Sequence, residues 1–320
     1  MSRSVAVIGG GPAGLYAARL LKLADPKAEV VVHERNSTDT TTFGFGVGLT
    51  ESTMANLTAA DPETADRIRR TSHAGHDLVL RLDHEVRLHG ARNLAIGRAD
   101  LLDVLTKAAI EAGVDFREGS RVGLADVGAD IVIAADGVRS AVRRELADRL
   151  GVHETLGRGH YMWCGADFAV DTAYFTARGE GDALFVAHAY PYAANRSTFL
   201  LEADDVSWAA AGLGDNDAAA APGESDTASI ALLERIFTED LRARPLLANR
   251  SRWSRFTNLT MDRWSTGNVV LIGDAAHTAH YTLGSGTKLA LEDSIALARA
   301  LREHSDITDA FAAYEQARRP

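Results

Sequence analysis

The chain has 320 residues, a formal net charge of −10 at pH 7 and one cysteine, Cys164. This length is enough for one large domain or two interlocked domains with a substantial core. A single cysteine excludes an internal disulfide framework and suits a reducing, cytoplasmic compartment, where we expect Cys164 to be a small apolar strand residue. The acidic balance argues against general binding to nucleic acid or to an anionic membrane, and no apolar run has the length of a transmembrane helix or the flanks of a signal peptide.

The N-terminal segment carries a glycine-rich motif. Four apolar residues, 5–8, precede a glycine turn, and a second apolar stretch, 15–21, follows it. This order predicts a buried strand that enters a helix through the pattern G-x-G-x-x-G. In that pattern Gly9 permits the tight turn, Gly11 lets the backbone approach a pyrophosphate, and Gly14 lets helix and strand pack closely. The N-terminus of the helix then offers free N–H groups to phosphates. The expected cofactor contacts in this turn are Gly9, Gly11, Pro12, Ala13 and Gly14.

An acidic residue stands where a dinucleotide site needs one. The apolar run 29–33 predicts a second strand, and Glu34 follows it directly. A carboxylate at this distance from the glycine turn can accept a hydrogen bond from a ribose hydroxyl. We therefore predict a dinucleotide site that includes Glu34 and Arg35; a glycine-rich turn without a ligand is the alternative.

A segment near the other end of the chain favours FAD over NAD. The apolar run 269–272 predicts a strand that ends in Gly273 and Asp274, and this carboxylate can bind the ribityl chain of a flavin. Gly284 and Gly286 precede a helix predicted from about residue 288 to 301. Their amides and the helix dipole can face the pyrimidine edge of the flavin, where negative charge gathers on reduction. A surface turn is the alternative. Thr287 and Lys288 complete the expected contacts, although Lys288 is equally well explained as a lysine in solvent.

A third strand with an acidic end lies between these two motifs. Residues 129–143 predict a strand that ends at Asp136-Gly137 and then runs into a helix. With three such motifs in this order, the chain resembles the group A flavoprotein monooxygenases, which are FAD-dependent aromatic hydroxylases of the p-hydroxybenzoate hydroxylase fold. The resemblance implies that Arg98, at the start of a helix, contacts the FAD phosphates. It also implies that Asp136 and Arg139 take part in binding FAD and NADH or NADPH.

The same resemblance implies the fold. We expect an α/β protein in which a Rossmann-like FAD-binding domain of the GR2 type is interlocked with a mixed-sheet substrate domain. The family continues beyond Pro320 with further helices, so we expect C-terminal helices to be missing from this sequence. The FAD-binding domain is predicted to comprise residues 1–70, 97–156 and 265–320, and the substrate domain residues 71–96 and 157–264.

Three segments of the expected substrate domain have patterns of their own. Residues 77–89 predict a hairpin, and the alternating pattern from about 157 to 204 predicts a sheet that covers the flavin. Residues 215–229 are small, polar and rich in alanine, so we expect a mobile loop there.

Two departures from the usual family pattern point to a narrower branch. Tyr281 stands where the family has proline, and Lys288 stands where it has asparagine. The stretch 273–293 and the loop 43–49 resemble the branch of the salicylyl-CoA 5-hydroxylases and the monooxygenase half of 2-aminobenzoyl-CoA monooxygenase/reductase. The violacein-pathway tryptophan hydroxylase is a related neighbour.

The branch implies a reaction. An electron-rich aromatic ring would be hydroxylated through a C4a-hydroperoxyflavin, with an aryl-CoA thioester such as salicylyl-CoA as the substrate and its 5-position as the target. Hydroxylation of free tryptophan, an indole or another small aromatic is an alternative. A flavoprotein that no longer hydroxylates and serves as a reductase or binding module is an alternative of another class.

Few side chains are candidates for direct chemistry, because the flavin carries the reaction. By resemblance, Tyr281 lines the substrate cavity, and His277 and His280 lie near the flavin. A structural role for His277 within the motif is favoured over a catalytic one. His73 and His76 have the look of a metal pair but lack partners at ligand spacing, so we expect no metal site.

A CoA ester would need cations for its phosphates, and arginine suits this geometry. Two groups of arginines are candidates, although such a run is more often a solvated surface. They are Arg242, Arg244, Arg250, Arg252 and Arg255, and Arg67, Arg69 and Arg70.

Overall fold

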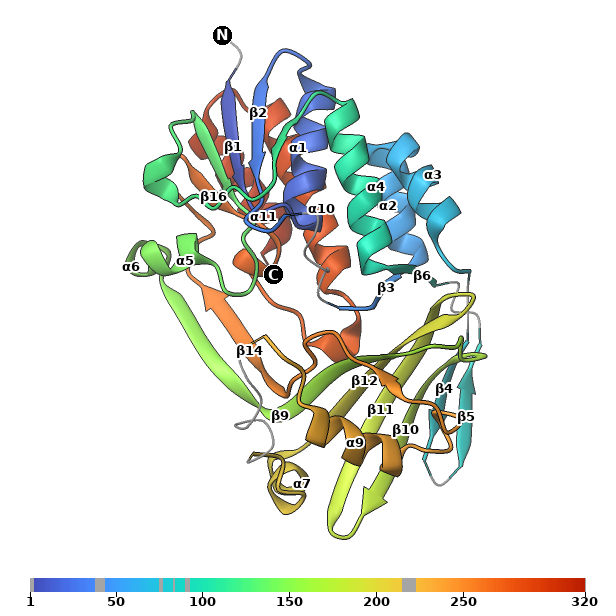
Figure 1. Ribbon diagram of the computed structural model, residues 1–320. Coiled ribbons are helices and arrows are strands. Elements are labelled where there is room, and N and C mark those ends of the chain that lie inside the picture. The colour runs from blue at the N-terminus through green and yellow to red at the C-terminus, as the bar shows by residue number, and fades with distance from the viewer. Residues whose placement is uncertain are drawn as a thin grey trace.

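The molecule has a parallel sheet with helices at one end and a second, mixed sheet at the other (Figure 1). The computed structural model describes residues 3–37, 44–74, 77–82, 84–89, 93–214 and 223–319. The predicted α/β class is confirmed by these two sheets. No helix in the described ranges is both long and apolar enough to cross a membrane.

The parallel sheet is built around β1 (Ser4–Ile8), as the sequence predicts. β2 (Glu29–His33) and β8 (Ile131–Ala134) pair with β1 on either side, and β16 (Val269–Leu271) pairs with β8, all in parallel. Every residue of β8 and β16 is buried, because strands of a parallel sheet are covered on both faces. Two short strands complete the sheet: β7 (Asp115–Arg117) is parallel to β2, and β15 (Ser265–Thr266) at the edge is antiparallel to β16.

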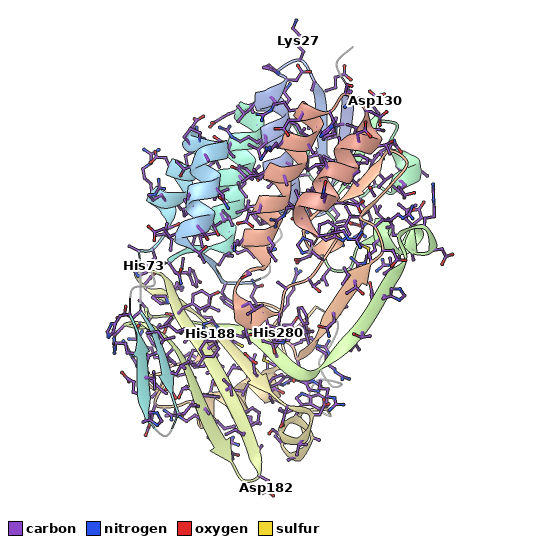
Figure 2. All side chains as sticks on the ribbon, turned by 180° about the vertical axis from the view of Figure 1, so that it is seen from behind. Lys27, His73, Asp130, Asp182, His188 and His280 are labelled. Carbon is purple, nitrogen blue, oxygen red and sulfur yellow. The ribbon has the colours of Figure 1, made fainter. Side chains whose placement is uncertain are left out.

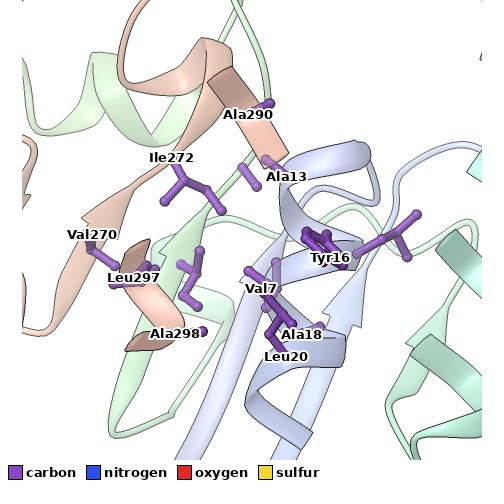
Figure 3. Close-up of a cluster of buried hydrophobic side chains, with 14 of the residues drawn as sticks. Val7, Ala13, Tyr16, Ala18, Leu20, Val270, Ile272, Ala290, Leu297 and Ala298 are labelled. Carbon is purple, nitrogen blue, oxygen red and sulfur yellow. The ribbon is translucent and has the colours of Figure 1, made fainter. Parts of the chain in front are cut away.

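Helices cover the parallel sheet. α1 (Pro12–Ala24) packs against α10 (Gly286–Glu303), and Figure 3 shows their apolar side chains meeting those of β1 and β16. α10 begins two residues before its predicted start. α11 (Ile307–Arg318) closes the chain, where Tyr314 Oη donates to the carbonyl oxygen of Leu271 at 3.1 Å. The other helices of this part are α2 (Glu51–Ala60), α3 (Pro62–Thr71), α4 (Arg98–Glu111), α5 (Ala141–Glu145) and α6 (Ala147–Leu150).

The second sheet contains the predicted strands between residues 157 and 204. Its order is β13-β9-β12-β11-β10-β4-β5, with β14 also paired to β9. The predicted hairpin is confirmed as β4 (Leu78–Arg81) and β5 (Glu85–Leu88), while Asp83 between them lies outside the described residues. Since β10 runs parallel to β4 and antiparallel to β11, the sheet is mixed. The remaining strands are β9 (Val152–Ala166), β10 (Ala173–Glu180), β11 (Ala183–Ala193), β12 (Arg196–Ala203), β13 (Leu246–Leu247) and β14 (Ser254–Met261).

The mixed sheet buries one face in a core of its own. Because side chains alternate along a strand, Phe185, Phe199 and Leu201 point to the same side, where α9 (Thr227–Ile236) packs. Cys164 lies in this core at 0% exposure, which confirms the predicted apolar strand position, and burial raises the pKa of its thiol to about 12. The opposite face is directed toward the parallel-sheet part of the molecule.

Two long strands and a small sheet connect the two parts. The long strands β9 and β14 run from one part into the other (Figure 1). A small two-stranded sheet, β3 (Gly46–Leu49) with β6 (Leu94–Gly97), also touches the mixed sheet, since the Gly46 N–H donates to Thr198 Oγ1 at 2.8 Å. β9 starts at residue 152 and crosses the predicted boundary at 156, and the division into domains stays a prediction.

The predicted loop at 215–229 is wrong at its end. Residues 215–222 lie outside the described ranges, but 227–229 form the first turn of α9. The Asp226 side chain caps this helix by accepting from the Ser229 N–H at 2.9 Å. An N-cap followed by an apolar stretch was the signal that the polar composition hid. α7 (Asp205–Ala210) precedes the segment.

Candidate functional site

The three motifs meet at one edge of the parallel sheet. They follow β1, β8 and β16, which lie side by side, so their turns lie together at the carboxyl ends of these strands. The packing between motifs is tight. A Cβ atom at Gly9, whose φ is 113°, would lie 2.3 Å from the Ala135 carbonyl oxygen, and one at Gly273 would lie 3.1 Å from the Ala13 Cβ. The structure thus brings together segments more than 250 residues apart.

The first turn is shaped for the backbone to approach a ligand. A Cβ atom at Gly14 would lie 2.1 Å from the Gly9 carbonyl oxygen, so only glycine allows the helix to pack on the strand here. At Gly11, in contrast, a Cβ atom would meet nothing within 4 Å. Gly11 also caps α1 without a side-chain hydrogen bond to its first turn, which Pro12 opens. This open helix N-terminus can receive an anion.

Glu34 lies next to the glycine turn, as its place in the sequence predicts. Its Oε2 accepts from the Gly10 N–H at 2.8 Å, and its Oε1 accepts from the Asn36 N–H at 2.8 Å. These two bonds fix the carboxylate at the carboxyl end of β2, facing the turn. Arg35, the neighbour with which it was predicted, has an exposed side chain.

Arg98 and Asp274 carry opposite charges, and protein atoms surround both side chains. Arg98 is the first residue of α4, as predicted, and its N–H donates to the Phe45 carbonyl oxygen at 2.7 Å. Burial lowers the pKa of Arg98 and raises the pKa of Asp274, while each charge partly offsets the shift of the other. The Asp274 side chain is nevertheless accessible to water. Asp274 therefore has protein atoms around it and still keeps a surface that a bound molecule can contact.

Arg143 ties the second motif to the third, a role that sequence reasoning missed. Its side chain is 2% exposed, and its Nη1 donates to the carbonyl oxygens of Ala275 at 3.0 Å and Asp274 at 3.3 Å. Its Nε donates to Glu154 Oε1 at 3.0 Å. The last residue of the 129–143 segment therefore holds the backbone beside Asp274.

Asp136 stabilises the turn of its own motif. Its Oδ2 accepts from the Ala141 N–H at 2.7 Å and the Val142 N–H at 3.3 Å, so it closes the turn that starts α5. Its Oδ1 is buried without a partner in the described part of the chain. Arg139, which was expected to act with it, is exposed. One carboxylate oxygen of Asp136 thus remains available to a bound molecule.

Asp293 organises the third motif, and it too was missed. This residue of α10 is 0% exposed, yet three donors surround it. Oδ2 accepts from the Gly273 N–H at 2.9 Å and lies 2.7 Å from His277 Nε2, while Oδ1 accepts from Arg318 Nε at 2.8 Å. The His277 ring also stacks on Trp264 at 4.8 Å between centroids. This arrangement favours the structural role for His277. An acid on the apolar side of a helix was the signal that could have revealed Asp293.

The start of α10 faces Asp274. Gly284 adopts a left-handed conformation with φ 58°, and Ser285 caps the helix without a side-chain hydrogen bond. A Cβ atom at Gly286 would lie 3.9 Å from Asp274 Oδ1, so this carboxylate and the first turn of the helix are neighbours. Thr287 and Lys288 belong to that turn, and both are partly exposed.

Aromatic side chains gather on the face of the mixed sheet that is directed toward these motifs. Tyr190 Oη donates to the Gly46 carbonyl oxygen at 2.7 Å, which sets the direction of this face. The Phe175 ring stacks on His188 at 4.0 Å, and Figure 2 shows His188 and His280 where the two parts of the molecule meet. We call this surface the aromatic face; its side chains are Tyr161, Trp163, Phe175, Val186, His188, Tyr190, Thr198, Leu200 and Glu202.

Tyr281 reaches the aromatic face from the loop between β16 and α10. Its ring lies 4.2 Å from that of Tyr161, and its Oη donates to Glu202 Oε2 at 3.3 Å. His280, which precedes Tyr281 in the chain, packs on Phe256, and its Nδ1 lies 2.8 Å from Thr282 Oγ1. Tyr281 therefore stands between the cofactor motifs and the aromatic face, which is where a substrate-lining residue would have to be.

The predicted arginine groups lie in different parts of the molecule. Arg67 and Arg70 of α3 form ion pairs with acids of their own or a neighbouring helix. Arg242 and Arg244 flank the Phe168 ring, and each pairs with an aspartate at 3.4 Å. Arg255 donates to the Gly157 carbonyl oxygen, and Arg69 Nη2 lies 3.4 Å from Thr58 Oγ1. Arg250 and Arg252 belong to the same segment as Arg255, and Arg250 is exposed.

The described residues hold no group of three or more side chains that could bind a metal ion. His73 forms a backbone bridge with Ala95, and His76 lies outside the described ranges.

Known proteins resemble the chain over almost its whole length. The model of a family described as FAD binding domain matches residues 2–126 and 123–320. Salicyloyl-CoA 5-hydroxylase of a Streptomyces species is 39% identical over 99% of this chain, which spans 62% of that relative. In Streptosporangium sibiricum, 3-hydroxy-4-methyl-anthranilyl-(aryl-carrier protein) 5-monooxygenase is 40% identical, with 99% of this chain and 84% of the relative covered.

A solved structure shares the fold. A variant of 2-methyl-3-hydroxypyridine-5-carboxylic acid oxygenase superposes with a TM-score of 0.80 at 22% identity, covering 100% of this chain and 88% of the other. The arrangement of a parallel sheet beside a mixed sheet is therefore common to both proteins.

Proposed function

This chain belongs to the FAD binding domain family of flavoprotein aromatic monooxygenases, and we propose that the whole protein hydroxylates an electron-rich aromatic ring with FAD, NAD(P)H and O₂. The resemblance to the group A monooxygenases and to their salicylyl-CoA 5-hydroxylase branch is confirmed by the family match and by the two relatives.

The residues at the edge of the parallel sheet where the three motifs meet fit FAD. We call this edge the cofactor edge. The open space at Gly11 and the uncapped N-terminus of α1 provide room and N–H groups for a pyrophosphate. Glu34 is oriented toward the same turn and can accept from a ribose hydroxyl, and Asp274 lies beside the N-terminus of α10. The unpartnered Oδ1 of Asp136 is a further acceptor. These donors and acceptors match a ligand that carries phosphates, hydroxyl groups and a ring with a polar edge.

Bound FAD, after reduction by NAD(P)H, supplies the activation of O₂ and the transfer of one oxygen atom. The chain's own residues would bind FAD and orient it. Arg98 places a positive charge at the cofactor edge. Arg143 and Asp293 hold the backbone around Asp274. The amides at the start of α10 offer positive potential where charge would develop during the reaction.

The observation that carries the proposal is the aromatic face opposite these motifs. A surface of aromatic rings can hold a flat aromatic substrate by stacking, at a centroid distance such as the 4.0 Å between Phe175 and His188 within this face. A few polar groups, among them Tyr281 and Glu202, can then fix its orientation. Such a site can present one edge of the ring to the cofactor.

We propose a thioester of a hydroxy- or aminobenzoic acid as the substrate. The names of both relatives support this, since one acts on a CoA ester and the other on an aryl group of a carrier protein. Exposed arginines such as Arg250 suit the phosphates that CoA and a phosphopantetheine arm share. A cytoplasmic location stays a prediction, which the lone, buried Cys164 supports.

The experiment is NAD(P)H oxidation by the purified, FAD-loaded protein with salicyloyl-CoA, free salicylate and tryptophan offered separately. We expect faster oxidation and one added oxygen atom with the CoA ester. Turnover of salicylate or tryptophan alone would discard the thioester, and oxidation without product from any of the three would contradict hydroxylation of these rings. Charge reversal of Arg250 and Arg252 should raise the KM for CoA esters only.

A further inference from the structure

One carboxylate of the aromatic face, Glu202, has surroundings that the binding of FAD does not explain. Glu202 lies on β12, opposite Tyr161 of β9 and Val186 of β11 in the register of the sheet. Its neighbours on the aromatic face are aliphatic or aromatic. A carboxylate in such surroundings needs compensating partners.

Only one of the two carboxylate oxygens of Glu202 has a hydrogen-bond partner among the described residues. Its Oε2 accepts a hydrogen bond of 3.3 Å from Tyr281 Oη. Its Oε1 is buried and has no hydrogen-bond partner among the residues that the structure describes. Buried polar atoms are normally paired, so an unpaired oxygen on a side chain of the aromatic face indicates a donor that the described residues do not supply.

Among the residues that the structure describes, no lysine or arginine forms an ion pair with Glu202. Tyr281 approaches from the loop before α10, with the His280 ring packed against its own, and Tyr161 approaches from β9. Beyond them, Asp274 and Arg139 act on Tyr161 with opposite effects on its pKa. Burial raises the pKa of Glu202, and the hydrogen bond from Tyr281 lowers it in part. The carboxyl group is therefore a better proton acceptor than a solvent-exposed glutamate.

Tyr161 also connects Glu202 with the cofactor edge. Its ring packs against Tyr281, and the negative charge of Asp274 contributes to raising the pKa of its hydroxyl group. Glu202 thus lies on the side of the sheet where a substrate ring would meet the cofactor.

We propose that Glu202 accepts a hydrogen bond from the electron-donating ring substituent of the substrate, a hydroxyl or amino group, and takes the proton of a phenol. This inference rests on the proposed function and names the residue that selects the substrate class. The unpaired Oε1 is the contact atom, and Tyr281 holds the other oxygen.

The proton step balances without a further reactant. The O–H bond of the phenol breaks, an O–H bond forms on Glu202, and the electron pair stays on the phenolic oxygen. The ring becomes richer in electrons at its ortho and para carbons, which are the positions that an electrophilic oxygen attacks. The proton later passes to water when product leaves. The two histidines of the same loop are less suited, because His277 contacts buried Asp293 and His280 contacts Thr282.

The test compares ligands that differ in one substituent. FAD-loaded wild type, Glu202→Gln and Glu202→Asp are titrated with salicyloyl-CoA and with benzoyl-CoA, which lacks the ring hydroxyl group. The matched control is Glu180→Gln, a carboxylate at the far end of β10 that pairs with Arg235 on the surface. FAD content serves as the check of folding.

We expect wild type to bind salicyloyl-CoA at least ~10-fold more tightly than benzoyl-CoA, because a site built for a hydroxyl group rejects the analogue without it. Glu202→Gln should lose most of this preference and lower kcat/KM for hydroxylation by about 100-fold or more. The acid limb of the wild-type pH profile, where Glu202 becomes protonated, should disappear in Glu202→Gln and persist, shifted, in Glu202→Asp. Glu180→Gln should behave like wild type.

The outcomes separate this inference from the proposed function. A preference that disappears in Glu202→Gln, without any hydroxylated product from wild type, would support the contact and refute the hydroxylation. Hydroxylation by wild type with an unchanged preference and pH profile in Glu202→Gln would refute the contact alone. Equal binding of the two esters by wild type would also overturn it. If Glu202→Gln lost FAD, an unshifted acid limb in Glu202→Asp would decide against Glu202.

Discussion

Replacing Asp293 by alanine is expected to loosen the cofactor site from inside. The change removes the acceptor for the Gly273 N–H at 2.9 Å, for His277 Nε2 at 2.7 Å and for Arg318 Nε at 2.8 Å. Removing one partner of a buried ion pair costs about 3–5 kcal/mol of the free energy of unfolding. We expect about 3 kcal/mol, the lower end, because Arg318 keeps Glu292 at 3.3 Å and is 18% exposed. The FAD affinity should fall as well, because the turn before Asp274 loses its support.

The assay is urea unfolding of the FAD-free protein, followed by circular dichroism, with FAD titration of the folded protein beside it. Asp293→Asn keeps one acceptor oxygen and should cost less, about 1–2 kcal/mol. The matched control is Glu303→Ala at the exposed end of the same helix, where a surface ion pair with Arg299 is expected to contribute at most about 0.5 kcal/mol. Equal stability of Asp293→Ala and Glu303→Ala would refute the role given to Asp293.

Other predictions concern charge, reactivity and packing. Because burial raises the pKa of Asp274, the FAD-free folded protein holds this proton more tightly than the unfolded chain does, so stability should fall as pH rises from about 4 through the raised pKa. Asp274→Asn should therefore melt higher than wild type at pH 7 and bind FAD more weakly; an equal or lower melting temperature would contradict the raised pKa of Asp274. Cys164, fully buried and with its pKa raised to about 12, should not react with a thiol reagent at pH 8 until the protein is unfolded, and rapid labelling of the folded protein would contradict this. Gly165→Ala puts a Cβ atom 2.6 Å from the Phe45 ring and should lower the free energy of unfolding in urea by about 1–3 kcal/mol. Gly179→Ala, whose Cβ atom would have its nearest contact at 3.5 Å, should lower it little. Similar losses in the two variants would disprove the close approach at Gly165.

Local patterns sufficed for the elements that surround the cofactor edge. The glycine turn after β1 and the acid after β2 could be predicted because each depends on its immediate neighbours in sequence. Parallel pairing of β1 with β2 then brings Glu34 to Gly10 automatically. The start of α9 was missed because the alanine-rich composition before it outweighed the capping signal of Asp226.

Long-range contacts could not be predicted in the same way. Arg143 and Asp293 act on a turn that lies 131 and 20 residues away in the chain, and Glu202 meets Tyr281 across 79 residues. Nothing next to Glu202 in the sequence indicates that it projects from the aromatic face. Its direction follows from the register of β12 between β9 and β11, which only the folded sheet defines.

The most direct test of the account is the origin of the oxygen atom in the product. The FAD-loaded protein is supplied with NAD(P)H, salicyloyl-CoA and ¹⁸O₂ in ordinary water, and the product is analysed by mass spectrometry. We expect one ¹⁸O atom in a ring-hydroxylated CoA ester, formed in step with NAD(P)H oxidation. Oxidation that yields only hydrogen peroxide with this ester, or a product whose new oxygen comes from water, would contradict the assignment of a flavin-dependent monooxygenase acting on an aryl thioester.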